Sequence, residues 1–394
     1  MSAGKTTLIY AAAFLVATAV ALVNLGMVFF ARDFHGASPS AIGWIAGLGS
    51  VSYALGCLLV QPLFRAALPQ HLIVAATVGA GLSAVAMLYA PSVPFLCAAM
   101  TGSGISLSFF WPPLMGWLSA GSEGRRLNVL LSRFSVAWSA GIVIGPYLCG
   151  SLSERSSRIP LQLAGALYAV TAVMLVVAYA LLPGLREAGR TREPGPAVAP
   201  ATPRTRMRYP ARVGLVATFV AIGAIVTVFP MAGRERLAFS TTAIGVALLV
   251  RALTNAAGFC LLGLTSRWHF RLRPLLFGQA ATAVVMAGLA LTGNYTLIVA
   301  LIGLTGLTGA LAYVESVFHG VSGSADRPLR MALHEALLAL GSMVGSVAGG
   351  AIYERTDLGT VYWLCAATLL AVVPVQILLR GPAEESLRKN RAMG

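Results

Sequence analysis

Twelve separate stretches of this chain are apolar over about 20 residues each, which is the length a helix needs to cross a bilayer. Inside lipid, a helix satisfies its backbone hydrogen bonds within one segment. The sequence therefore predicts an all-α polytopic membrane protein with twelve transmembrane helices. The predicted spans are Thr7–Phe30, Ser40–Gln61, His71–Tyr89, Val93–Trp117, Val129–Gly150, Ile159–Leu182, Val213–Gly233, Thr241–Leu264, Pro274–Thr292, Tyr295–Phe318, Met331–Ile352 and Leu358–Leu379.

The composition excludes other classes of protein. Of the 394 residues, 57% are hydrophobic and 10% are charged. Soluble domains carry roughly 25% charged residues, so this chain has too little charge to cover a water-facing surface. Its apolar content excludes disorder. Five Cys cannot staple a secreted scaffold of this length, and they show no metal-ligand spacing.

The basic residues are distributed unevenly between the two sides of the membrane. An even number of spans places both termini on one side. If that side is the cytoplasm, the cytoplasmic segments hold 20 Lys and Arg and the outer loops hold six. Such an excess is typical of cytoplasmic segments, so we expect cytoplasmic termini in a bacterial-type inner (plasma) membrane. The net charge of +15 comes with no basic stripe or stacking motif, so we expect no nucleic-acid partner.

A polar stretch rich in Pro, Ala and Arg divides the chain near its middle. This composition is typical of a flexible linker. We therefore predict an N-terminal six-helix half (1–182), a basic cytoplasmic linker (183–212), a C-terminal six-helix half (213–379) and a cytoplasmic tail (380–394).

The two halves repeat each other at nearly one offset, as a parallel repeat of six spans requires. With a shift of 200 residues, the fifth span matches the eleventh: Gly141, Gly145, Gly150, Glu154 and Arg155 fall on Gly341, Gly345, Gly350, Glu354 and Arg355. With a shift of 202 residues, the second span matches the eighth: Ser38, Ala41, Ile42, Gly43, Gly56 and Arg65 fall on Ser240, Ala243, Ile244, Gly245, Gly258 and Arg267.

The fifth span contains a Gly-rich stretch in which Gly141, Gly145, Pro146 and Gly150 recur. Together with the six-plus-six spans, the basic central loop and the duplicated halves, this stretch resembles the Gly-Pro motif of the major facilitator superfamily, with Cys149 in place of one Gly. The resemblance implies a secondary transporter whose two pseudo-symmetric halves rock about a central site. The loop after the second span departs from the family pattern, because it has one Arg and no Asp.

The small-xxx-small spacing of Gly141 and Gly145, and of Gly341 and Gly345, has a structural interpretation. Small residues at this spacing let helix backbones approach closely in lipid. We interpret these four residues as packing positions. In the fourth span, Pro112 follows an aromatic cluster and predicts a kink or a break.

Arg251 is the most informative charge, since it lies ten residues inside its predicted span. An ionisable group at that depth is costly and often marks a transport pathway. A guanidinium can bind a carboxylate or phosphate with two hydrogen bonds, and Asn255 lies one turn further on the same face. Arg251 and Asn255, with Trp111 and Asn24, are our candidate substrate-binding residues. A buried structural ion pair is the alternative for Arg251.

Four further ionisable residues lie about one turn from the cytoplasmic ends of their spans: Arg133, Glu315, His334 and Glu335. In the superfamily, spans four, five, ten and eleven approach each other on that side. Arg133 is therefore a candidate to pair with Glu315 or Glu335 when the inner gate is closed. His334 or Glu335 is a candidate to carry a proton. Snorkelling to the interface, or a purely structural pair, is the alternative for all four.

These patterns predict a secondary active transporter that moves a small organic anion by alternating access, with coupling to protons. The alternative is proton-antiport efflux of drugs or lipophilic metabolites, and a non-transporting receptor on the same scaffold is a third reading. No ATP-binding or hydrolase motif is present. We therefore expect no enzymatic activity, cofactor or metal, and a monomer whose partners are the substrate and the bilayer.

Overall fold

A computed structural model describes residues 3–59, 68–119, 124–181, 206–322 and 327–380. This part of the chain is helical and contains no strand. Its elements are α1 (Ala3–His35), α2 (Pro39–Leu59), α4 (Pro69–Leu88), α5 (Val93–Ser108), α6 (Trp111–Ser119), α7 (Gly124–Ser153), α8 (Arg158–Leu181), α10 (Arg208–Glu235), α11 (Thr241–Gly263), α12 (Leu272–Leu291), α13 (Tyr295–Val321), α14 (Arg327–Arg355) and α15 (Leu358–Arg380).

Twelve helical segments are long and apolar enough to cross a membrane, which confirms the predicted number of spans. The fourth span is broken into α5 and α6, as its prolines predict. Pro112 and Pro113 lack backbone N–H groups and can enter a helix only near its start. The chain therefore turns at Phe109 and Phe110, whose N–H groups bond to the carbonyls of Ser106 and Leu107, and restarts at Trp111.

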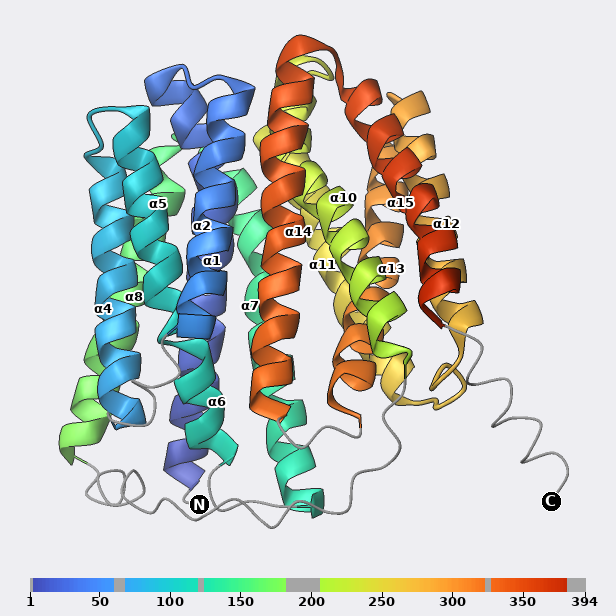
Figure 1. Cartoon of the computed structure of the whole chain (residues 1–394). Helices are drawn as coiled ribbons and strands as arrows, with labels where there is room; N and C mark the ends of the chain where they lie inside the picture. The colour runs from blue at the N-terminus through green and yellow to red at the C-terminus, as the bar shows by residue number, and fades with distance from the viewer. Residues whose placement is uncertain (1–2, 60–67, 120–123, 182–205, 323–326, 381–394) are drawn as a thin grey trace, which may run out of the picture.

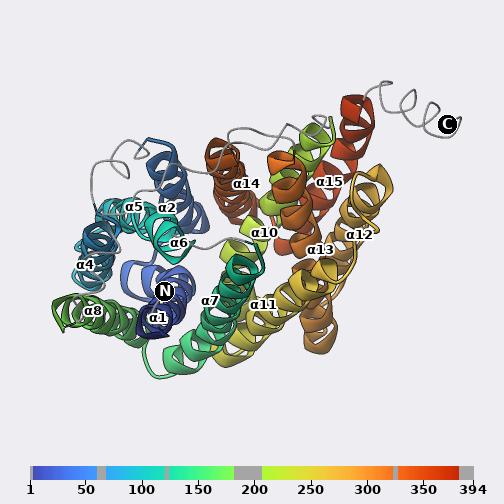
Figure 2. The same ribbon diagram turned by 90° about the horizontal axis from the view of Figure 1, so that it is seen from below.

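The helices form two groups that lie side by side (Figure 1). Helices α1 to α8 make one group and α10 to α15 make the other. Seen from below, α2 lies against α14 and α7 lies against α11 (Figure 2). These two pairs form the main contacts between the groups, and we call them the two seams. The linker predicted at 183–212 lies outside the described residues as far as residue 205.

One helix of each group is much more enclosed than the others. The buried share of the most apolar 18-residue stretch is 78% in α1 and 72% in α10. In the other spans this share ranges from 22% to 50%. These two helices carry many small residues, so neighbouring helices can surround them closely. The lower values of the other helices are those of faces turned toward lipid.

Within each group, glycines set the packing of the fifth and eleventh spans. A Cβ at Gly141 or Gly145 would overlap α1, at the backbone of Phe14 and at Ala21 respectively. A Cβ at Gly341 or Gly345 would overlap the backbone of α10 in the same way. The repeated glycines therefore hold α7 on α1 and α14 on α10, at distances that a larger residue would prevent.

We predict that Gly345→Ala destabilises the packing of α14 on α10 in the second group of helices. The added Cβ would meet the carbonyl oxygen of Val220, a backbone atom that cannot rotate away, and such overpacking costs about 1–3 kcal/mol. The matched control is Gly263→Ala, because a Cβ there meets nothing within 4 Å. Thermal unfolding of the two purified variants should show a lower midpoint for Gly345→Ala alone. Equal midpoints would contradict the packing role of Gly345.

Candidate functional site

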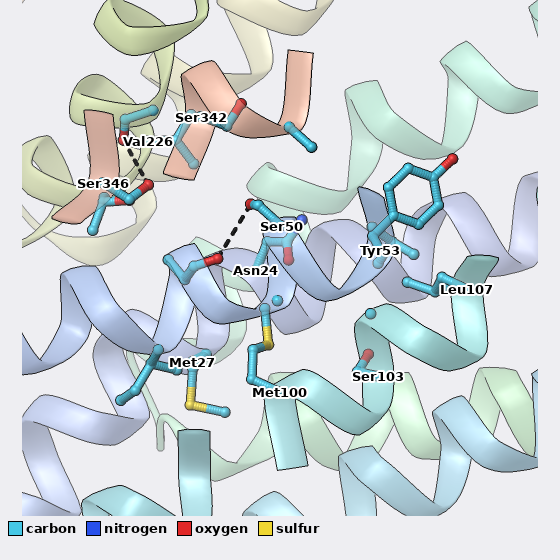
Figure 3. A pocket seen from close by; sticks show the side chains of 18 of the residues that line it. Asn24, Met27, Ser50, Tyr53, Met100, Ser103, Leu107, Val226, Ser342 and Ser346 are labelled. Carbon is cyan, nitrogen blue, oxygen red and sulfur yellow. Dashed lines mark hydrogen bonds between the residues drawn. The ribbon is translucent and has the colours of Figure 1, made fainter. Parts of the chain in front are cut away.

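A cavity of about 370 Å³ lies between the two groups of helices (Figure 3). Helices α1, α2, α5, α6 and α7 line it from the first group, and α10 and α14 line it from the second. Residues from both groups thus face one shared cavity, as a central transport site requires.

The wall of the cavity is uncharged. Its aromatic and thioether side chains come from the first group: Met27, Tyr53, Met100, Trp111 and Trp138. None of the described residues that line it is charged. Apolar walls with a few polar groups are typical of small-molecule sites.

Two hydroxyls of the second group are already engaged with protein atoms. Thr227 donates to the hydroxyl of Ser346 at 2.8 Å, and Ser346 donates to the carbonyl of Gly223 at 3.4 Å. Their remaining lone pairs can therefore only accept hydrogen bonds from a ligand. Asn24 and Ser342 also line the cavity and make no hydrogen bond with another side chain in the described residues. Their polar groups are free for a ligand.

The structure brings together two of the four candidate binding residues. Asn24 and Trp111 line the cavity, whereas Arg251 and Asn255 do not. Asn255 donates to the carbonyl of Gly306 at 3.1 Å and so joins α11 to α13. Arg251 is half-buried, and its Nε is enclosed without a hydrogen-bond partner.

The candidate gating and coupling residues lie mainly in the second group. Arg133 is exposed, and in the described part of the chain it forms no ion pair with Glu315 or Glu335. Glu315 is fully buried, and neither of its carboxylate oxygens has a hydrogen-bond partner. His334 is also buried, and its Nδ1 hydrogen-bonds with the hydroxyl of Ser316 at 2.9 Å. Glu335 is half-buried and accepts a long hydrogen bond of 3.4 Å from Tyr313.

At the upper end in Figure 1, carboxylates at the ends of α7 and α14 cap helices of the opposite group. Glu154 follows α7 and accepts a hydrogen bond of 2.9 Å from the backbone N–H of Thr242, in the first turn of α11. Glu354, near the end of α14, accepts bonds of 2.9 Å from the N–H of Ser40 and 3.0 Å from the hydroxyl of Ser38, at the start of α2. A carboxylate at a helix N-terminus satisfies an unpaired N–H and interacts favourably with the helix dipole.

Glycines bring the same helix ends into close contact along both seams. A Cβ at any of four glycines would overlap a backbone carbonyl of the opposite group: Gly43 at Ser346, Gly350 at Pro39, Gly150 at Thr241 and Gly245 at Pro146. These pairs are related by the 200- and 202-residue offsets of the sequence repeat. The repeated residues at this end are therefore those at which the two groups meet.

Two exposed ion pairs join the groups at the same end. Arg32 pairs with Glu235, and Asp33 pairs with Arg234, so the end of α1 is linked to the end of α10. Such exposed pairs contribute about 0–1 kcal/mol each. Caps, close glycine contacts and ion pairs together close the bundle at the end opposite the first residues of α1.

Comparison with known proteins agrees with this geometry. The sequence profile of the Major Facilitator Superfamily matches residues 9–317 and 214–394. The chain belongs to the major facilitator superfamily. It is therefore a membrane transporter and not an enzyme, built on the twelve-helix fold that the sequence predicts. No curated protein sequence matches the chain.

Solved transporters share the fold at low sequence identity. The nucleoside transporter NupG is 10% identical with a TM-score of 0.72, and the match covers 95% of this chain and 98% of that one. A bacterial homologue of the human lysosomal transporter Spinster, in an inward-facing and occupied conformation, is 12% identical with a TM-score of 0.68, covering 95% and 94%. A POT family transporter in complex with 5-aminolevulinic acid is 10% identical with a TM-score of 0.75, covering 95% and 96%.

Sequence reasoning did not assign several residues of this site. The repeat contains Glu154 and Glu354, and only their matched positions could have indicated a shared role. The cavity hydroxyls of Ser342 and Ser346, and the ring of Tyr53, give no signal in a single sequence, because Ser and Tyr are common in helices of every kind.

We predict that Glu154→Gln and Glu354→Gln each loosen the closed end. Gln keeps an acceptor oxygen but removes the charge, whose interaction with the helix dipole contributes about 0.3–1 kcal/mol, or about a two- to fivefold change in the ratio of closed to open molecules. The matched control is Asp357→Asn, because Asp357 caps Thr360 of its own group at 2.8 Å and crosses no seam. Distances between spin labels at the ends of α1 and α10 would measure the populations. A shift in the control equal to that in the variants would contradict the role of the cross-seam caps.

The Glu154 cap also predicts a pH dependence. The backbone N–H of Thr242 holds the pKa of Glu154 below its ordinary value in the closed form. The ionised carboxylate therefore stabilises closure at neutral pH, and this contribution is lost as the pH falls through the lowered pKa. The same spin-label distances, recorded during acidification, should show opening in the wild type and less change in Glu154→Gln.

Proposed function

We propose that this transporter carries an uncharged, largely apolar organic molecule in the central cavity. The observation that supports this choice is the absence of charge among the described residues that line the cavity. A charged ligand enclosed without a counter-charge would pay a large desolvation cost. A volume of about 370 Å³ lies near the lower end of the range for small-molecule sites. We propose that the apolar part of the ligand contacts the aromatic and thioether side chains of the first group. The hydrogen-bond donors of the ligand would then face the hydroxyls of the second group.

The proposed mechanism is alternating access. The two six-helix halves, 1–182 and 213–379, rock about the cavity, and the closed end described above is one of the two gates. We further propose cytoplasmic termini in a bacterial-type inner membrane, on the basis of the 20-to-six distribution of Lys and Arg, and a monomer as the working unit. With this orientation, the structure is closed on the outer side.

Proton coupling is part of the proposal and rests on the acids of the second half. Glu315 and Glu335 lie inside the spans of α13 and α14, where an ionised carboxylate is costly. His334 lies beside Glu335 and is held by Ser316. Arg133 is exposed and unpaired with these acids here, so its pairing with Glu315 or Glu335 belongs to the state that is closed at the opposite end. Efflux of lipophilic metabolites by proton antiport fits these features together with an apolar cavity.

A second candidate is the transport of an organic anion bound by Arg251. It is favoured by one observation: Arg251 lies within the span of α11, and no described acid forms an ion pair with it. An anion bound there would supply the missing counter-charge. Asn255 would then act through the contact between α11 and α13, since its side-chain amide donates to Gly306.

Pairs of aromatic carboxylates and their primary amides distinguish the two candidates, because the members of each pair differ mainly in charge. Ligand binding raises the thermal unfolding midpoint of the purified protein by mass action. We expect stabilisation by amides, about tenfold weaker binding in Trp111→Ala from loss of an aromatic contact, and unchanged binding in Arg251→Gln. Stabilisation by carboxylates alone, lost in Arg251→Gln, would instead establish the anion carrier.

A further inference from the structure

Glu335 extends the cavity-lining face of α14 by one helical turn. The residues of α14 that line the cavity are Leu338, Ala339, Ser342 and Ser346. Glu335 precedes Leu338 by three residues and Ala339 by four, which are the spacings that place side chains on one face of a helix. The half-buried carboxylate therefore lies at the rim of the cavity, toward the first residues of α14.

The register of the first seam places α2 opposite this carboxylate. Gly43 of α2 meets Ser346, and Gly47 meets Met343 and Val347, so the two helices run antiparallel. Continuing the register brings the stretch from Tyr53 to Cys57 opposite Glu335. Consistent with this, Glu335 interacts electrostatically with both Tyr53 and Cys57, and the Tyr53 hydroxyl lies beside the Cys57 thiol.

Tyr53 therefore belongs to two sites at once. Its side chain is part of the cavity wall (Figure 3). It also lies near an ionisable group of the opposite half, across a seam that must move during transport. By contrast, Tyr313 donates to Glu335 from α13, within the same half, so that contact can persist while the halves rock.

The other ionisable groups near Glu335 are engaged elsewhere. His334 hydrogen-bonds with Ser316 and packs edge-on against Tyr313, with ring centres 4.6 Å apart. It also interacts electrostatically with Arg212 of α10. Glu315 is enclosed within the second half, away from the cavity lining. In the described part of α15, no titratable group interacts with Glu335. The groups that face Glu335 from other helices are thus Tyr53 and Cys57 on α2 and Tyr313 on α13.

We propose that Glu335 is the proton-binding group coupled to the cavity, and that Tyr53 is the residue that couples them. The proposal rests on the proposed proton-driven transport and selects one of the three candidate groups, Glu315, His334 and Glu335. An ionised Glu335 is stabilised by polar groups around it, and the Tyr53 hydroxyl lies near it only while α2 and α14 keep the register seen here. The affinity of Glu335 for a proton therefore differs between the two states, and protonation shifts the equilibrium between them.

The test combines a titration with a measurement of conformation and needs no known substrate. Infrared difference spectra recorded during acidification report the protonation of carboxylic acids. Spin labels at the last residues of α2 and the first residues of α14 report the separation of the two halves. The variants are Glu335→Gln, Tyr53→Phe and Tyr313→Phe, with Glu315→Gln to test the competing acid and Asp357→Asn as the control. Thermal unfolding and a monodisperse elution profile confirm that each variant is folded.

The expected results differ among the variants. Glu335→Gln should lose one carboxylic-acid signal and hold, at every pH, the distribution that the wild type reaches only in acid. Tyr313→Phe removes a donor to the ionised acid and Tyr53→Phe removes a polar hydroxyl near it, so both should raise the titration midpoint by about 0.5 to 1 pH unit. Only Tyr53→Phe should also reduce the pH-dependent change in distance, because only Tyr53 crosses the seam. Asp357→Asn should retain the wild-type response, and a response that persists in Glu315→Gln but not in Glu335→Gln assigns the proton to Glu335.

Two results would overturn the proposal. One is a wild-type conformational response in Glu335→Gln, and the other is a response in Tyr53→Phe that equals that of Tyr313→Phe. A second measurement distinguishes failure of this coupling from failure of the proposed function. It is the binding of aromatic amides at fixed pH, followed by quenching of Trp111 and Trp138 fluorescence. Amide binding with no Glu335-dependent switch would overturn the coupling alone, whereas a switch without amide binding would overturn the uncharged substrate alone.

Discussion

The close approach of two helix pairs, α2 with α14 and α7 with α11, is the constraint on which the rest of the structure depends. Four glycines allow this approach, since a Cβ at each would overlap a carbonyl of the opposite half. Lipid supplies no hydrophobic force between helices, so close van der Waals packing must hold them together. At the upper ends of the seams, Glu154 and Glu354 add hydrogen bonds across the halves. Because these contacts repeat by pseudo-symmetry, both seams have similar geometry.

The seams also determine where a ligand can bind. Helix α14 packs against α2 and α10, and α10 is the most enclosed helix of its half. The cavity is therefore bounded in the second half by α10 and α14, while five helices of the first half contribute to it. This unequal division separates the chemistry: the aromatic and thioether groups lie on the first wall, and the hydroxyls of Thr227 and Ser346, whose protons are already used, lie on the second. Charged groups of the second half lie outside the lining.

The spans, their number and the duplicated halves could be predicted from sequence, because hydrophobic length and internal repeats are one-dimensional signals. The break of the fourth span could also be predicted, since Pro112 and Pro113 act locally. The candidate site was less accessible. Depth in the membrane identified Arg251 as unusual, but depth does not tell which neighbour a helix face meets, and α11 contributes no residue to the cavity lining. Trp111 and Asn24 do line it, yet Tyr53, Ser342 and Ser346 give no signal without knowledge of which helices pack together.

The position of Glu335 shows how one helix can serve two tasks. An acid inside the cavity would favour cationic ligands, whereas an acid far from it could not sense occupancy. Glu335 lies one turn beyond the lining residues of α14, on the same face. Its nearest donor, Tyr313, belongs to its own half, and Tyr53, across the seam, is also part of the cavity wall. A proton on Glu335 and a ligand against Tyr53 then act on the same moving contact between α2 and α14. Coupling between the two needs no other pathway than this seam.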